Sequence, residues 1–218
     1  MSAIAAIVVL GCSAVSGPAI VGARKYIERR RARRVLAERP PLGTETPDGT
    51  LVRVTGTVRV RDTTIVAPLS GVACVAARAR VSSGIPHKRG ATFSPEWFAI
   101  VSFVLERERE PPVVVEGVHA RLDLPAARLG SAKRGSPELA RRDQLLLQLG
   151  IKRIALGGGC EEVVVTAGMR VSIAGLMMLG VPPAPPAAGE LGFRDQPPAT
   201  IRIVGSATYP LVIGAPVA

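Results

Sequence analysis

The side chains that most often do chemistry in proteins are scarce in this chain, which holds two histidines and three cysteines in 218 residues. His87 lies beside Lys88 and Arg89, where a histidine could act as a base or contact a phosphate. No second histidine, cysteine or acidic cluster is near it in the sequence, so we interpret it as an exposed loop residue. His119 alternates with Arg121 on the solvent face of a predicted strand. Neither histidine is predicted to be catalytic.

The cysteines Cys12, Cys74 and Cys160 form an odd set without short spacings, which does not predict a disulfide framework. Cys74 lies in an apolar segment and is predicted to be a small core residue. Cys160 precedes Glu161 and Glu162, whose negative charges should raise the pKa of its thiol. We therefore expect no activated cysteine nucleophile.

Two other segments resemble functional sites only superficially. Residues 157–160 (Gly-Gly-Gly-Cys) lack the Lys-Ser/Thr pair that completes a phosphate-binding loop. Residues 106–110 alternate glutamate and arginine, which is typical of a solvated hairpin end and not of a paired-carboxylate site. We predict no catalytic residue, no metal site and no cofactor, and we expect that the protein is not an enzyme. A membrane-bound hydrolase with a site built from distant residues is an alternative that the sequence leaves open.

The formal net charge is +11, and its distribution indicates which anionic partner is favoured. Residues 24–39 hold eight basic side chains against Glu28 and Glu38, a net +6 in sixteen residues. We interpret this stretch as a basic collar for anionic lipid head groups, because each basic residue at a membrane surface contributes about 1 kcal/mol. The residues predicted to face the lipid are Arg24, Lys25, Arg29, Arg30, Arg31, Arg33 and Arg34.

An uncharged apolar segment precedes the collar. Residues 2–23 contain no charge, and as a helix they would rise about 33 Å, against a hydrocarbon core of about 30 Å. We therefore predict one transmembrane helix at residues 3–23 that anchors the chain in the lipid bilayer. The positive-inside rule places the N-terminus outside and the soluble domain on the cytoplasmic side. Ser13 and Gly17 form a small-xxx-small pair that would suit a homodimer.

Two alternatives for the N-terminal segment describe a lipoprotein or an exported envelope protein. A cleaved signal peptide has positive charge before its apolar run, whereas here the positive charge follows it. Residues 9–12 (Val-Leu-Gly-Cys) resemble a bacterial lipobox, which would make Cys12 a lipidated N-terminus. Either alternative would place the remaining chain on the periplasmic side or attach it by lipid at Cys12.

The rest of the chain is predicted to be mainly β (α+β), a curled sheet or partial β-barrel with one short helix. Glycine and proline are frequent, at 23 and 19 residues, and aromatic residues make up 3% of the chain. Turn residues at 40–50 predict a linker, so the β domain is expected at residues 51–213. Residues 51–61 alternate apolar and polar side chains, which predicts a strand with one wet face. Further strands are predicted at residues 72–81, 97–106, 113–122, 162–166, 169–176, 199–204 and 208–213.

One helix is predicted between residues 136 and 149. Ser136 is the expected N-cap, Pro137 occupies the first helical position, and Gly150 marks the end. The leucines expected to pack on the sheet are Leu139, Leu146 and Leu149. A second uncharged run at 171–189 is interrupted by prolines after about ten apolar residues, too few for a membrane span. It predicts a buried strand followed by a proline-rich loop.

A longer motif begins after the first predicted strand. Residues 67–71 read Ala-Pro-Leu-Ser-Gly, and Cys74-Val75 follow, after a Gly-Thr-Val at residues 56–58. With this pattern, the chain resembles the GIDE or BAM ("beside a membrane") domain of mitochondrial-anchored and chloroplast-envelope ubiquitin ligases. The family motif residues are Ala67, Pro68, Leu69, Ser70, Gly71 and Cys74.

The resemblance implies a β-rich domain beside a membrane that contacts protein partners. It does not extend to ubiquitin ligase activity, because a RING needs about eight cysteine and histidine ligands for two zinc ions. The chain has three cysteines and two histidines, and no second span follows the predicted domain. The family's domain lies in the intermembrane space, whereas the charges here predict the cytoplasmic side, and we follow the charges.

These observations predict a single-pass, membrane-anchored interaction domain that presents a β-rich module to an unidentified protein partner. The alternative from another class is an OB-like nucleic-acid-binding domain tethered to the membrane, since a basic β domain has the required charge. Scarce aromatic residues for base stacking, and a net charge of about +5 outside the collar, disfavour nucleic acid.

Overall fold

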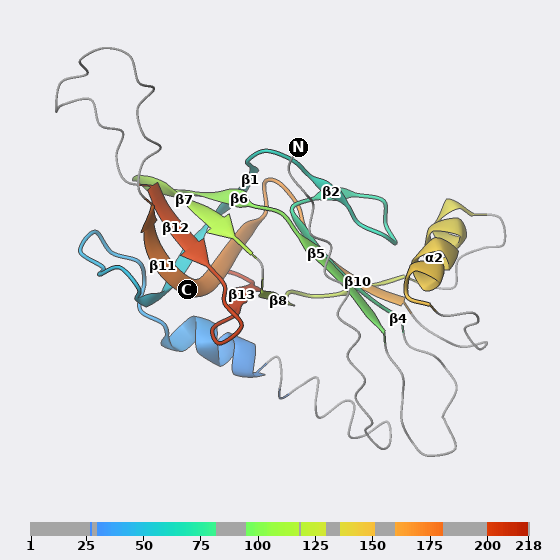
Figure 1. Cartoon of the computed structure of the whole chain (residues 1–218), viewed down its shortest axis with the longest axis horizontal. Coiled ribbons are helices and arrows are strands. Elements are labelled where there is room, and N and C mark those ends of the chain that lie inside the picture. The colour runs from blue at the N-terminus through green and yellow to red at the C-terminus, as the bar shows by residue number, and fades with distance from the viewer. Residues whose placement is uncertain are drawn as a thin grey trace, which may run out of the picture.

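The computed structural model describes residues 27, 30–81, 95–117, 119–129, 136–150, 160–180 and 200–217 (Figure 1). Within these ranges the chain is mainly β, as predicted, with short helices at residues 30–38 and at α2 (Pro137–Gln148). The described part of the chain contains no helix with the length and apolar character of a membrane span. The anchor predicted at residues 3–23 lies outside the described residues.

Five strands form a closed barrel, whereas the sequence predicted a curled sheet or a partial barrel. β1 pairs antiparallel with both β6 and β11, β6 with β7, and β11 with β12, while β7 and β12 run parallel and close the ring. The barrel closes through pairing between strands that are far apart in the sequence. The hydrophobic periodicity of a single segment does not indicate such pairing. The barrel strands are β1 (Leu51–Val60), β6 (Phe103–Arg107), β7 (Glu110–Glu116), β11 (Arg170–Gly180) and β12 (Thr200–Val204).

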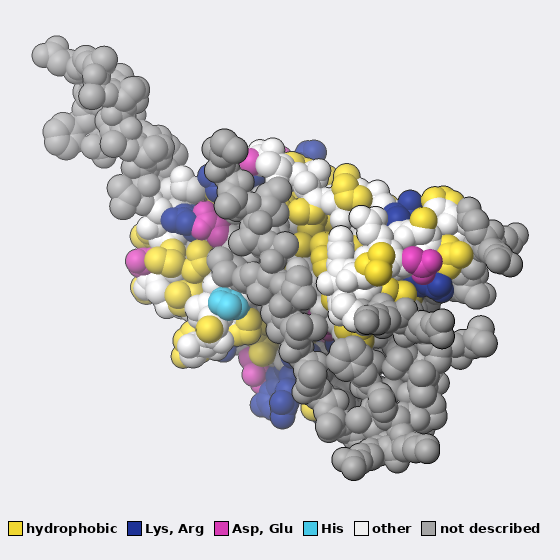
Figure 2. Space-filling view, turned by 45° about the vertical axis from the view of Figure 1, so that its right-hand side comes forward, with side chains coloured by type: hydrophobic (Ala, Val, Ile, Leu, Met, Phe, Trp, Pro, Cys, Tyr) yellow, Lys and Arg dark blue, Asp and Glu magenta, His cyan; other side chains and the backbone are white. Residues whose placement is uncertain are grey.

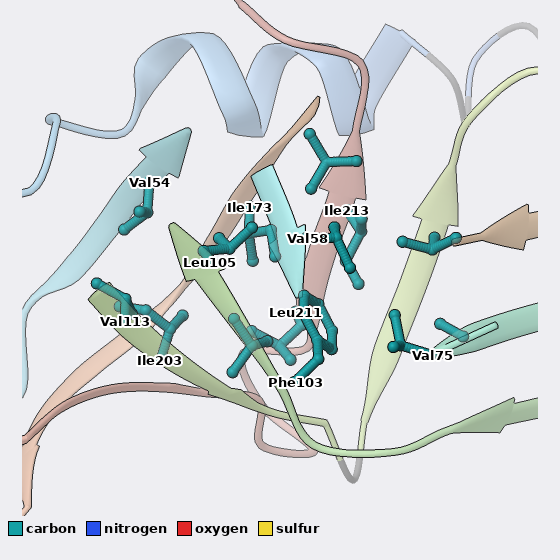
Figure 3. Packing of buried hydrophobic residues seen from close by; sticks show 14 of the residues in the cluster. Val54, Val58, Val75, Phe103, Leu105, Val113, Ile173, Ile203, Leu211 and Ile213 are labelled. Atoms are coloured by element: carbon teal, nitrogen blue, oxygen red, sulfur yellow. The ribbon is translucent and has the colours of Figure 1, made fainter. Parts of the chain in front are cut away.

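The barrel interior is filled by alternate residues of these strands (Figure 3). Val58, Phe103, Leu105, Ile173 and Ile203 come from four strands and are completely buried. Successive side chains of a strand point to opposite faces, so a sheet with one buried face has apolar residues at every second position. Branched and aromatic side chains pack well at such positions. The wet face predicted for residues 51–61 lies on the outside of the barrel.

A second, four-stranded sheet lies beside the barrel, in the order β5, β4, β10, β9. It is assembled from two insertions, one between β1 and β6 and one between β7 and β11. One face joins the barrel core through Val163 and Val165, and the other is covered by a two-stranded ribbon and α2. The strands are β4 (Ala76–Val81), β5 (Glu96–Ile100), β9 (Ala127–Leu129) and β10 (Cys160–Val165), and the ribbon is β2 (Ile65–Val66) with β3 (Ala73–Cys74).

Two strands predicted as continuous are each divided in the structure. Residues 97–106 form β5 and β6, because the chain leaves the second sheet at Val101 and enters the barrel at Phe103. Residues 113–122 likewise divide into β7 and β8 (Ala120–Asp123). β8 pairs parallel with β13 (Leu211–Gly214), and β13 pairs with β11, so both extend the barrel sheet.

Helix α2 begins and ends as predicted. The Ser136 hydroxyl accepts a hydrogen bond from the backbone of Leu139 at 3.3 Å, and Gly150 follows the helix with a positive φ of 70°. The prediction for Leu139 was wrong, since it is only partly buried and Leu145 takes its place beneath the helix. The leucines packed on the second sheet are Leu145, Leu146 and Leu149.

Residues 40–50, for which turn residues predicted a linker, run along the barrel. Leu42 is buried in the main core, and its backbone amide donates to the carbonyl of Arg53 at 2.9 Å. The Asp48 carboxylate accepts a hydrogen bond from the backbone of Leu179 at 2.9 Å. The folded unit therefore includes these residues as well as the helix at 30–38 that precedes them.

Candidate functional site

The described part of the basic collar is a helix with two different faces. Ala32 and Leu36 are buried against Ala174 of β11 and Val212 of β13. This packing uses one side of the helix, because residues four apart lie on the same face. The arginines at positions 30, 31, 33 and 34 are all exposed. Basic side chains gather at the lower edge of Figure 2, the side on which this helix lies in Figure 1.

The helix at residues 30–38 packs closely against the barrel. A Cβ at Gly214 would lie 2.5 Å from a terminal methyl of Leu36, so glycine permits the close approach. The Arg53 guanidinium donates to the carbonyl of Leu36 at 3.2 Å and satisfies one of the last carbonyls of the helix. At the C-terminal end of the chain, Val217 packs on the same cluster, and its amide donates to the Ser172 hydroxyl at 3.0 Å.

The structure places four of the seven predicted lipid-facing residues, Arg30, Arg31, Arg33 and Arg34. All four lie on the exposed side of one short helix, and Arg34 forms an ion pair with Glu38. The sequence predicted the charge of this segment but not its fixed attachment to the barrel. The spacing of Ala32 and Leu36 would have indicated a packed face. The remaining residues of that set, Arg24, Lys25 and Arg29, lie outside the described residues, as do Cys12, Ser13, Gly17 and His87.

The Ala-Pro-Leu-Ser-Gly motif at residues 67–71 forms a tight turn between β2 and β3. Ala67 donates to the carbonyl of Val72 and accepts from the amide of Gly71, each at 2.9 Å. Glu162, a carboxylate only 2% exposed, accepts from the amides of Leu69 at 2.8 Å and Ser70 at 2.9 Å. The buried charge thus has two donors, which offset the cost of removing it from water.

Helix α2 holds the same turn from the other side. The Arg141 side chain donates to the carbonyl of Leu69 at 2.8 Å. Gly71 has a φ of 76°, which favours glycine, and a Cβ there would lie 3.2 Å from the Arg141 guanidinium, which would have to shift slightly. Glu162 and Arg141 therefore form a clamp on the turn. Sequence reasoning missed this role of Glu162, which the alternation of β10 places on the same side as Cys160 and Val164.

Both described cysteines are buried and free. Cys74 is a core residue, as predicted; burial raises the pKa of its thiol to about 11, and the charge of Glu162 acts in the same direction. Burial also raises the pKa of the Cys160 thiol, while Arg142 opposes the shift. The sequence also predicted a raised pKa for Cys160. The main cause, however, is burial of the thiol and not the charge of the neighbouring glutamates. Neither thiol is poised as a nucleophile.

The remaining polar candidates lie on the surface, except for the side chain of Arg107, which is only 8% exposed. His119 is exposed, as predicted, and the histidine coloured in Figure 2 lies at the surface. The β6–β7 hairpin ends at residues 108–109, where Arg107 pairs with Glu110 and Arg170 pairs with Glu108. Among the described residues, no group of histidine, cysteine, aspartate and glutamate side chains is arranged to hold a metal ion.

Numbered along the chain, the five barrel strands are neighbours in the order one, two, three, five, four, with strands three and five parallel, an order that resembles that of OB-type Greek-key barrels. Such barrels commonly bind ligands on the face of strands two and three, which here are β6 and β7. The outward glutamates of these strands are paired, Glu106 with Arg59 at 2.7 Å and Glu116 with Arg202. No protein-family model, curated protein sequence or solved structure matches the chain.

Proposed function

We propose that this protein is a membrane-anchored interaction module, in which an N-terminal helix at residues 3–23 spans the bilayer and an OB-type domain binds a protein partner on the cytoplasmic side. The basic collar contacts anionic lipid head groups. The family resemblance and the uncharged segment at residues 2–23 support the anchor and the class of partner. The module acts by binding and not by catalysis.

The observation that best supports the proposal is the two-faced helix at residues 30–38. Its apolar side is packed on β11 and β13 through Leu36, while its arginines extend into solvent directly after the apolar segment. A helix packed in this way holds its arginines in one position relative to the barrel. The barrel is then presented to partners in one orientation instead of on a loose tether.

Membrane attachment is tested by fractionating cells that express the full chain. We expect the chain in the membrane fraction after washing with alkaline carbonate, which removes proteins held only by charge. Deletion of residues 2–23 should move it to the soluble fraction. Recovery of the undeleted chain in the soluble fraction, or a mature chain that begins at Cys12, would contradict the anchor.

The collar is tested separately with vesicles that contain phosphatidylserine. In a chain that lacks residues 2–23, changing Arg30, Arg31, Arg33 and Arg34 to serine should weaken vesicle binding on the order of a thousandfold, at about 1 kcal/mol for each arginine. The matched control removes the same number of positive charges from arginines outside the collar, and it should bind as the parent does because these arginines are not part of the proposed lipid-binding surface. The control arginines are Arg59, Arg61, Arg170 and Arg202. Equal losses in both variants would exclude a specific role for the collar.

Nucleic-acid binding is the alternative that the OB-type topology favours. Against it, the outward charges on β6 and β7 are neutralised by ion pairs, and Phe103 on β6 is completely buried. We expect single-stranded oligonucleotides to bind weakly and only through the collar. Tight binding with a steep loss in salt, retained when the four collar arginines are changed, would favour this alternative.

A further inference from the structure

The collar helix, at residues 30–38, packs on the outside of the barrel and not in its core. The alternation of β11 and β13 places Ala174 and Val212 on the outer side, while their neighbours along both strands fill the barrel interior. Ala32 and Leu36 of the helix cover these two outward residues. The cluster that they form is separate from the main core. The helix can therefore leave its position without opening the barrel.

Few contacts hold the collar helix on the barrel. Among its described residues, Ala32 and Leu36 are buried, at 2% and 1% exposure, and Val35 adds a partly buried side chain. The Arg53 guanidinium adds a hydrogen bond to the carbonyl of Leu36 at 3.2 Å. The main core, by contrast, is built from all five barrel strands and part of the second sheet. Elements with few buried apolar contacts open more readily than the core to which they are attached.

The segment at residues 215–217 helps to hold the helix. Val217 packs on the helix cluster, and its amide donates to the Ser172 hydroxyl at 3.0 Å. Ser172 is completely buried, and its hydroxyl is also hydrogen-bonded to that of Thr55 at 2.7 Å. The segment is thus fixed to the outer side of β11. A change at Val217 loosens the position of the helix and leaves the helix sequence unaltered.

The barrel covers the side of the helix that would also enter a lipid surface. Ala32, Val35 and Leu36 share one side, because residues three and four apart lie on the same face, and the arginines at positions 30, 31, 33 and 34 are exposed. A basic helix with one apolar side lies in the interface of a bilayer, with that side toward the acyl chains and its basic side chains among the head groups. In the docked state the barrel occupies the apolar side, and only the arginines are available to lipid.

We propose that the barrel and an anionic lipid surface compete for the apolar side of the collar helix. On neutral lipid the helix stays docked beside residues 215–217. On anionic lipid the arginines draw the helix away, its apolar side enters the head-group region, and the outer side of β11 and β13 is uncovered. The contact with the barrel is thus autoinhibitory. The inference rests on the lipid contact of the proposed function and adds a second, deeper mode of binding to it.

A cysteine on the barrel reports whether the helix is in place. Val212→Cys, in the full chain with Cys12 changed to serine, puts a thiol beneath the helix at a position that is 6% exposed. The chain is reconstituted in phosphatidylcholine nanodiscs with or without phosphatidylserine and treated with a water-soluble maleimide. We expect slow labelling in neutral lipid and labelling faster by on the order of tenfold in anionic lipid, because each basic side chain near an anionic surface adds to the attraction. High salt should remove the difference.

Three comparisons make this result specific to the helix. Ile213→Cys, on the same strand but in the barrel core, should label slowly in both lipids. The buried native thiols of Cys74 and Cys160 should stay unlabelled in every variant, which checks that the barrel is folded. Adding Val217→Ser to Val212→Cys should give fast labelling even in neutral lipid, because it weakens the packing that keeps the helix docked.

Two outcomes would overturn the proposal. Slow labelling of Val212→Cys in both lipids would show that the helix stays docked, even if changing the collar arginines to serine weakens vesicle binding as the proposed function predicts. Fast labelling in both lipids would show that the helix is not docked on neutral lipid. Ala174→Cys, 3% exposed beneath the same helix, is the second reporter if Val212→Cys does not fold. Failure of the anchor is distinguishable, since the chain would then not remain with the nanodiscs.

Discussion

Glu162 determines the shape of the turn at residues 67–71, because one carboxylate accepts hydrogen bonds from two consecutive amides of the turn. Glu162→Gln keeps the size of the side chain but removes its charge and turns one acceptor oxygen into a donor that faces an amide. We expect the free energy of unfolding to fall by about 2–4 kcal/mol, since hydrogen bonds to charged groups contribute about 1.5–3 kcal/mol each. Urea denaturation measures the change. Glu106→Gln, in an exposed pair, should cost less than about 1 kcal/mol and serves as the control.

The thiol of Cys74 should be inert in the folded protein at neutral pH. Its pKa is raised to about 11 by burial and by the charge of Glu162, so the reactive thiolate is scarce at pH 8. We expect iodoacetamide to label it only after unfolding, as mass spectrometry would show. The folded state holds this proton more tightly than the unfolded state. Its contribution to stability is therefore complete below pH 9 and is lost as the pH rises toward 11. Rapid labelling of the native protein at pH 8 would contradict the burial.

At the scale of elements, the helix at residues 30–38 is attached to the barrel mainly through Leu36. Leu36→Ala should cost about 2–4 kcal/mol in the free energy of unfolding, because the side chain is 1% exposed and the space that it leaves cannot fill easily. Faster amide hydrogen exchange at residues 30–38 should accompany the loss. Leu147→Ala is the matched control, since Leu147 on α2 is 76% exposed, and it should change stability by less than about 0.5 kcal/mol. Similar costs for both variants would contradict the docked helix.

Helices and strands marked by local sequence features could be predicted. Strand ends that depend on the packing of one sheet beside another could not. The N-cap at Ser136 and the alternation of residues 51–61 are local features, and both appear where they were predicted. The break after Val101 has no strong turn residue, because the chain only passes from one sheet to another there. In the candidate site, arginine content predicted the charge of residues 30–34, but the contacts of Leu36 and Glu162 join segments far apart in sequence.

For the whole molecule, the interleaved insertions predict that barrel and second sheet unfold together. Trp97, the single tryptophan, lies in the second sheet, whereas Leu105 fills the barrel. Leu105→Ala should destabilise the chain by about 2–5 kcal/mol. It should shift the unfolding midpoint equally by Trp97 fluorescence and by far-ultraviolet circular dichroism, because Val163 and Val165 join both parts into one core. Two separate transitions would show that the second sheet is an independent unit.

The parallel pairing of β7 with β12 has a consequence for biosynthesis. β12 and β13 follow the other described strands in the sequence, and the ring cannot close, nor the arginine-rich helix pack on Val212, until they have been made. Because a chain is synthesised from its N-terminus, this barrel cannot form before residues 200–214 have been translated. Throughout that interval the arginines of residues 30–34 precede an unfinished barrel. The lipid contact that we propose for them could therefore form before the barrel closes.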